Sequence, residues 1–131
     1  AAVDPAAEPP YIYWWSDAQA YATGGSSTLA VGQPRQAEAH FRDALACISP
    51  AFPRERLHIL TKLALARVQL RELDGACRAA TEAGTLLRRL DSQDKRTLLA
   101  EFRTAAQPYV NTTQVKEFDA KFGDLLRPTS V

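Results

Sequence analysis

The sequence contains no methionine, only two cysteines and two histidines, and no long uninterrupted apolar run. The missing methionine indicates a fragment or a processed piece of a longer product. Polar residues such as Lys62 and Arg67 interrupt the most apolar stretch, 57–70, so it falls short of the roughly 20 residues that a membrane span needs. The first residues have neither the basic start nor the apolar core of a signal peptide. We therefore expect a cytoplasmic chain with no membrane partner.

Residue types that carry catalysis or metal binding are also sparse. Cys47 and Cys77 form no CxxC pair, and His40 and His58 lack further ligands at helical spacing. The chain has no Gly-Lys-Ser/Thr phosphate loop and no Gly-x-Ser-x-Gly nucleophile turn. We therefore expect no catalytic residues, no metal and no cofactor. The protein is not expected to be an enzyme.

The formal net charge is only +1, although the middle of the chain, 54–103, carries +4. Part of this excess lies between two expected helices, in a candidate basic patch formed by Arg88, Arg89, Arg96 and Arg103. Such a patch fits nucleic acid or an acidic partner. Acidic residues are interleaved with these arginines, for example Asp91 and Glu101, which favours local neutralisation. A helical nucleic-acid-binding domain is therefore the alternative function.

Apolar residues recur at three- and four-residue spacing from Tyr11 onward, which is typical of amphipathic helices. The expected helices cover 13–30, 35–48, 54–70, 75–90, 93–106 and 113–126. Residues 1–10 hold three prolines and predict a linker or arm. We expect a single domain over 11–127, a tail over 128–131, and the all-α fold class.

The expected helices contain an internal repeat with an offset of 39 residues. Tyr21 aligns with Leu60, and Gly25 aligns with Ala64. The same offset places Ala37 on Ala76, Phe41 on Ala80 and Ala44 on Ala83. Self-similarity at such a period is typical of stacked helical repeats.

In its first copy the pattern resembles the tetratricopeptide repeat (TPR), in which a large residue and a small residue precede an alanine and an aromatic residue. Tyr21, Gly25, Ala37 and Phe41 stand at matching places, and Pro50 follows. Thr28 and Arg67 replace the family's tyrosine, about five residues are inserted between copies, and the third helix pair lacks the matching alanine. The resemblance covers roughly 12–126. It implies an antiparallel stack of helix hairpins in a short right-handed superhelix.

In TPR-like stacks the first helix of each hairpin lines a concave groove that binds a protein or peptide. The positions that would face this groove are Gln19, Ala22, Ser26, His58, Thr61, Lys62, Leu65 and Gln69. A segment with an acidic and an apolar side chain suits this set, through a charge-assisted hydrogen bond to Lys62 and contact with Leu65. The alternative is that these are ordinary solvated helix positions.

Trp14 and Trp15 form a second candidate binding feature. Adjacent residues on a helix point about 100° apart, so both cannot face one narrow core stripe. One of them is a candidate aromatic anchor for a partner or a homodimer, because aromatic residues concentrate in binding hot spots. The alternative is packing beneath the proline-rich arm.

The segment Ala30–Ala37, with Gly32 and Pro34, and the later pair Ala44-Leu45 are similar to the C-terminal helical regions of actinobacterial helix-turn-helix transcriptional regulators. This resemblance implies a regulatory domain whose DNA-binding part lies outside this chain. The expected function is a non-catalytic protein-interaction or oligomerisation module.

Overall fold

The computed structural model describes residues 10–90 and 93–126, with the side chains of 17–90 and 95–126. Within these ranges the chain forms α-helices and one short 3-10 helix, with no strand. The elements are α1 (Pro10–Ala30), α2 (Pro34–Cys47), α3 (Pro53–Gln69), α4 (Leu73–Leu90), α5 (Gln93–Ala105), η1 (Gln107–Tyr109) and α6 (Thr113–Leu126). The all-α class is confirmed for this part of the chain.

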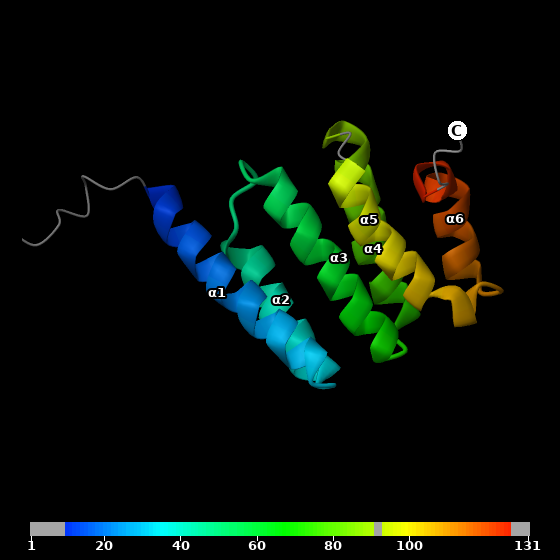
Figure 1. The fold of residues 1–131 in the computed structure, drawn as a ribbon, viewed down its shortest axis with the longest axis horizontal. Coiled ribbons are helices and arrows are strands. Elements are labelled where there is room, and N and C mark those ends of the chain that lie inside the picture. The colour runs from blue at the N-terminus through cyan, green and yellow to red at the C-terminus, as the bar shows by residue number, and fades with distance from the viewer. Residues whose placement is uncertain (1–9, 91–92, 127–131) are drawn as a thin grey trace, which may run out of the picture.

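Successive helices run in opposite directions (Figure 1), and short turns join α1 to α2, α2 to α3 and α3 to α4. Packing is most extensive between α1 and α2 and between α3 and α4. Helix α3 also packs against α2 and α5, whereas α1 and α3 touch each other only slightly. In Figure 1, α1 lies over α2 and α5 lies over α4, with α6 at the far end. The helix α6 packs more closely on α4 than on α5.

The helix ends follow from local chemistry. Pro34 and Pro53 each occupy a first-turn position, where the missing N–H of proline leaves no hydrogen bond unmade. The turn between α1 and α2 contains Gly32 with a positive φ of 79°, and the turn between α3 and α4 contains Arg71 with a φ of 60°. Both turns close their helices with a residue in the left-handed region, the usual helix C-terminal motif.

These two turns also repeat each other at the 39-residue offset. In the first, the N–H of Gln33 donates to Thr28 O at 2.9 Å. In the second, the N–H of Glu72 donates to Arg67 O at the same distance. The helix ends follow the same register, since α1 and α3 end 39 residues apart and α2 and α4 begin 39 residues apart. The repeat expected from the sequence is therefore present in the backbone of the first four helices.

The close crossing of α1 and α2 depends on Gly25. A Cβ atom placed there would lie 2.6 Å from Cε1 of Phe41, whose side chain is fully buried. In the second copy, fully buried Ala64 and Ala80 stand at these two positions. The first hairpin thus packs a glycine against a phenylalanine where its helices cross. The second hairpin has two alanines at the equivalent positions.

The core continues from α3 and α4 into the last helices. Phe102 of α5 meets Phe118 of α6 edge-on, with ring centroids 5.1 Å apart, and Phe118 lies 5.3 Å from Phe122. Gly84 lets Phe122 approach α4, because a Cβ there would lie 2.7 Å from the ring. This aromatic cluster holds α6 against α4.

A buried ion pair joins the two repeat copies. Glu38 of α2 is only 8% exposed, and it accepts hydrogen bonds from Arg67 Nε at 3.0 Å and Arg35 Nη1 at 3.2 Å. Arg67 also donates from Nη1 to the carbonyl oxygen of Gly75 at 3.1 Å. Three helices, α2, α3 and α4, therefore meet at one guanidinium group.

Two local expectations need correction. Tyr21, the large residue of the first repeat copy, is 38% exposed because α1 is covered mainly by α2. Its counterpart Leu60 lies in the middle of the stack and is 2% exposed. The helix expected over 75–90 begins two residues earlier, at Leu73.

We predict that Gly25→Ala lowers the free energy of unfolding by about 1–3 kcal/mol, because the new methyl group overlaps the buried ring of Phe41. Gly24→Ala is the matched control. Its Cβ would lie 3.4 Å from His40, an ordinary contact, so the better helix propensity of alanine is expected to add up to about 1 kcal/mol. Urea denaturation of both variants measures the difference. Equal effects of the two substitutions would contradict a tight crossing at Gly25.

We predict that Arg71→Gly is more stable than Arg71→Ala by about 1 kcal/mol. Both variants remove the exposed arginine side chain, but only glycine adopts the positive φ at this position without steric strain. Thermal denaturation of the pair measures this difference. Equal stability would show that the turn relaxes away from the left-handed conformation.

Candidate functional site

A cleft of about 390 Å³ lies where α1 and α3 barely touch each other. We call it the α1–α3 cleft. Its lining residues are Gln19, Ala22, Thr23, Ser26 and Ser27 of α1, Glu55, His58 and Ile59 of α3, and Lys95 of α5. Most of these groups are hydrogen-bonding hydroxyl, amide, imidazole or charged side chains. The cleft is therefore suited to recognising polar groups.

Helical spacing accounts for the wall of this cleft. Gln19, Thr23 and Ser26 are separated by four and three residues, so they form one stripe on α1. His58 and Glu55 stand three residues apart on the first turns of α3. Lys95 is the one lining residue that comes from α5, so the spacing along α1 and α3 does not account for it.

His58 is the half-buried titratable group of the cleft. Burial lowers its pKa from the ordinary value of 6.5, and the positive charges of Lys62 and Lys95 lower it further. The carboxylate of Glu101 acts in the opposite direction. His58 is therefore neutral at pH 7, with one ring nitrogen able to donate a hydrogen bond and the other able to accept one.

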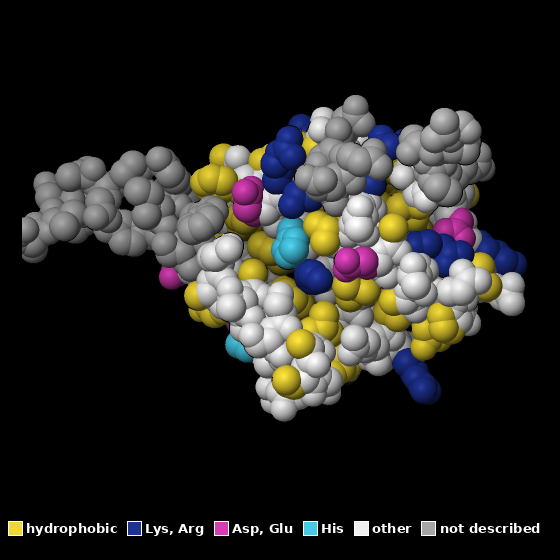
Figure 2. Space-filling model, viewed as in Figure 1, with side chains coloured by type: hydrophobic (Ala, Val, Ile, Leu, Met, Phe, Trp, Pro, Cys, Tyr) yellow, Lys and Arg dark blue, Asp and Glu magenta, His cyan; other side chains and the backbone are white. Residues whose placement is uncertain are grey.

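Charges of both signs surround the cleft, and Figure 2 shows them close together near the centre of this face. Lys62 Nζ lies 3.8 Å from Glu101 Oε2, which joins α3 to α5. Glu55 and Lys95 line the cleft and form no ion pair with any described residue. These two side chains are the charged groups most available to a ligand.

The structure brings together Gln19, Ala22, Ser26 and His58 of the expected groove. Lys62, Leu65 and Gln69 lie farther along α3 and do not line the cleft. Leu65 packs partly against the core, and Gln69 is exposed. Only part of the expected groove therefore belongs to a single cleft.

Thr61 does not belong to this surface at all. Its side chain is 0% exposed, and its hydroxyl donates to Leu57 O at 3.0 Å. Leu57, Thr61, Ala64 and Val68 follow each other at three- and four-residue spacing on the buried face of α3. A threonine tolerates this position because its hydroxyl bonds to the carbonyl oxygen four residues earlier.

The expectation missed Thr23, Ser27, Glu55 and Lys95. The i+4 spacing from Gln19 could have identified Thr23, and the i−3 spacing from His58 could have identified Glu55. Lys95 carried no such signal, because its place beside the cleft depends on how α5 packs over α3.

Two of the four arginines of the candidate basic patch, Arg88 and Arg103, are paired with carboxylates. Arg88 binds both carboxylate oxygens of Asp124, at 2.8 Å and 3.1 Å, donates to the carbonyl oxygen of Lys121, and lies over the ring of Phe122. The hydrogen bond from Arg88 lowers the pKa of Asp124. These contacts place the charge of Arg88 against α6.

Arg103 is held in the same way by another acid of α6. Its Nε and Nη2 donate to the two oxygens of Asp119 at 2.7 Å and 3.0 Å. Arg89 is exposed beside Pro50 and Pro53, and Arg96 is partly buried. The sequence predicted that acids interleaved with the arginines would neutralise their charge. The acids that pair with Arg88 and Arg103 instead come from α6.

Some expectations fall partly outside the described residues. Trp14 and Trp15 lie within α1, but their side chains are not among those that the structure describes. Among the described residues no group of three or more His, Cys, Asp or Glu could hold a metal ion. No described helix is long and apolar enough to cross a membrane.

We predict that the free energy of unfolding rises with pH through the region just below 6.5, and that His58→Gln flattens this rise. The unfolded chain binds a proton at His58 in this region, whereas the folded chain with its lowered pKa binds less, so acid favours unfolding. Urea denaturation at a series of pH values measures the slope. An unchanged slope in His58→Gln would contradict the prediction.

Comparison of the chain with protein-family models, with curated proteins and with solved structures found no match. The chemistry of the cleft is therefore inferred from its own residues. Within the described chain, His58 makes no hydrogen bond to Ser26, Ser27 or Glu55. The cleft thus presents separate polar contacts, without a hydrogen-bonded nucleophile and base.

Proposed function

We propose that this chain is a non-catalytic protein-interaction module that binds a short segment of a partner protein in the α1–α3 cleft. The observation that carries the proposal is the cleft itself, a polar recess built by three helices between two copies of a repeated hairpin. Grooves of this kind bind extended or helical segments through side-chain contacts on a rigid frame.

The repeat supports a TPR-like stack as the frame of this site. The turn hydrogen bonds and helix ends recur at 39 residues, and the first helices of the two copies, α1 and α3, supply the walls. This is the side on which TPR-like stacks bind their ligands. The regulator resemblance of Ala30–Ala37 further favours the regulatory part of a bacterial transcriptional regulator, acting in the cytoplasm.

The charged side chains of the cleft indicate where an acidic residue of the partner would bind. Lys62 is engaged by Glu101, so the acidic side chain of a partner is expected at Lys95 instead. Gln19, Ser26 and neutral His58 are able to bond the backbone of the bound segment. We therefore expect a ligand with an acidic residue next to a stretch of exposed backbone.

The nucleic-acid alternative has less support. Arg88 and Arg103 each bind a carboxylate of α6 through two hydrogen bonds, so their charges are already paired. A phosphate would have to displace these carboxylates. The proposed partner is accordingly a protein or peptide.

We predict that peptides selected from a random display library on the parent chain bind Lys95→Glu about 10- to 100-fold more weakly, the range expected for loss of a hydrogen bond to a charged group. Lys116→Glu is the matched control, because Lys116 is exposed on α6 and does not line the cleft. Fluorescence anisotropy measures the affinities. Equal losses in both variants, or none in either, would contradict binding at the cleft.

A further inference from the structure

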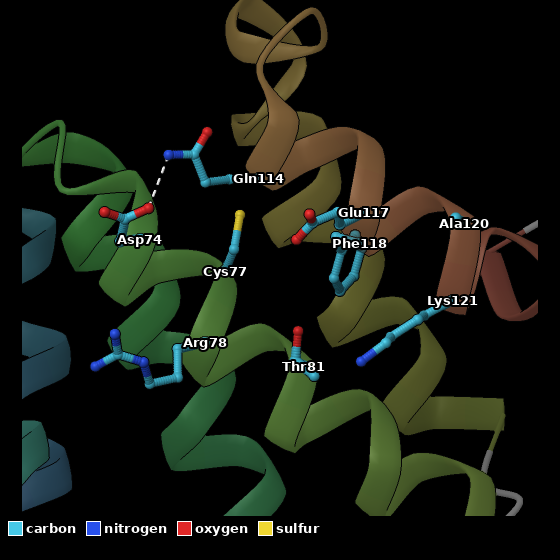
Figure 3. A pocket seen from close by; sticks show the side chains of 9 residues that line it. All are labelled: Asp74, Cys77, Arg78, Thr81, Gln114, Glu117, Phe118, Ala120 and Lys121. Atoms are coloured by element: carbon cyan, nitrogen blue, oxygen red, sulfur yellow. Dashed lines mark hydrogen bonds between the residues drawn. The ribbon is translucent and has the colours of Figure 1, made fainter.

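A second and larger recess, of about 680 Å³, lies between α4 and α6. No residue of α1, α2, α3 or α5 lines it, so it is separate from the α1–α3 cleft. Cys77 and Thr81 of α4 and Phe118 and Ala120 of α6 contribute its less polar lining. Figure 3 shows this α4–α6 groove and the sulfur of Cys77 pointing toward it.

The two helices that form the groove run in the same direction. Asp74 Oδ1 accepts a hydrogen bond from Gln114 at 2.7 Å, and farther along both helices Arg88 meets Asp124. Residue numbers therefore rise together on both sides of the groove. Figure 1 shows the same parallel course for α4 and α6.

Each side of the groove carries an acid followed four residues later by a base. On α4 these are Asp74 and Arg78, and on α6 they are Glu117 and Lys121. Because the helices are parallel, the two bases lie toward one end of the groove, on opposite sides of it, and the acids lie toward the other end (Figure 3). The groove is thus polarised along its length.

These charges are not satisfied within the described chain. Arg78, Glu117 and Lys121 form no side-chain hydrogen bond or ion pair with any described residue, and Asp74 is bonded only to the amide of Gln114. The neighbouring contacts between α4 or α5 and α6 are different, since Arg88 is paired with Asp124 and Arg103 with Asp119. The three residues without such a partner, Arg78, Glu117 and Lys121, all line the groove.

The chemistry of the groove favours recognition over reaction. Burial raises the pKa of Cys77, and the carboxylates of Asp74, Asp119 and Glu117 raise it further, so the thiol is held in its unreactive form. No set of described residues here could hold a metal ion. What the groove offers is a concave, less polar floor between two rows of charge.

We propose that the α4–α6 groove binds an amphipathic helix of a partner protein. The helix lays small apolar side chains on Cys77, Thr81 and Phe118. It places a Lys or Arg between Asp74 and Glu117, and one turn away an Asp or Glu between Arg78 and Lys121.

Spacing and shape both favour a helix as the occupant. The acid and base of each row are four residues apart, about 6 Å along a helix axis, which is the distance between charges at i and i+4 on a bound helix. A concave groove between two helices fits the convex surface of a single third helix. The same face of a second copy of this chain would be concave as well, and so would fill the groove poorly.

Three synthetic helical peptides of about five turns, with the same apolar stripe, test this proposal. One peptide carries Lys and Glu one turn apart, one carries only Lys, and one carries only Glu at these positions. The mixed peptide is expected to bind the parent chain at least about 10-fold more tightly than either uniform peptide, because each uniform peptide places like charges together at one end. Fluorescence anisotropy measures the affinities, and amide chemical shifts locate the site.

Charge-reversal variants of the groove test the same proposal from the side of the protein. Arg78→Glu/Lys121→Glu should switch the preference to the all-Lys peptide, and Asp74→Lys/Glu117→Lys should switch it to the all-Glu peptide. All four residues are exposed, so both variants are expected to fold, which circular dichroism checks. The control Lys116→Glu, on α6 but outside the groove, should leave the ranking unchanged.

Several outcomes overturn the proposal. These are equal or undetectable binding of the three peptides, an unchanged ranking in both double variants, and shifts confined to α1 and α3. Analytical ultracentrifugation of the chain alone tests whether a second copy of the chain occupies the groove. A homodimer that both double variants abolish would assign the groove to a second copy of this chain, which also overturns a partner helix.

Discussion

Burying the carboxylate of Glu38 between two helices imposes the strictest constraint on this fold. An unpaired buried charge is strongly destabilising, so Arg67 must be held within hydrogen-bonding distance of it. Burial raises the pKa of Glu38, but the hydrogen bond and charge of Arg67, helped by Arg35, outweigh this effect and lower it. The carboxylate therefore stays ionised, and its partner stays bound. Because Arg67 also bonds to Gly75 O, the same contact positions the start of α4.

The α1–α3 cleft depends on this constraint. Helix α1 is carried by α2, and α2 is joined to α3 at Glu38 and Arg67, while α1 and α3 themselves touch only slightly. The placement of α1 relative to α3 therefore depends on how α2 packs against α3, on the other side of the first hairpin.

Much of the fold was predictable from local patterns. Apolar periodicity and prolines gave the helices to within a few residues, and the alanine spacing at Ala37 and Ala76 revealed the repeat that the turns confirm. The site was less predictable. Periodicity alone did not place Thr61 on the buried face of α3, because one polar hydroxyl at a core position looks like a surface residue. Lys95 reaches the cleft, and Asp119 and Asp124 reach the arginines, only through the packing of whole helices.

The slight contact between α1 and α3 also bears on how the molecule opens. Helices in such a stack are stabilised mainly by their neighbours, so the energy of local opening varies along the array. Separating α1 and α2 together from α3 exposes mainly the α2–α3 interface, whereas removing α3 or α4 exposes several interfaces. The first hairpin is therefore expected to open with less free energy than α3 or α4, whose amide hydrogens should exchange most slowly. A ligand that bridges the cleft would link α1 directly to α3 and so slow exchange in the first hairpin.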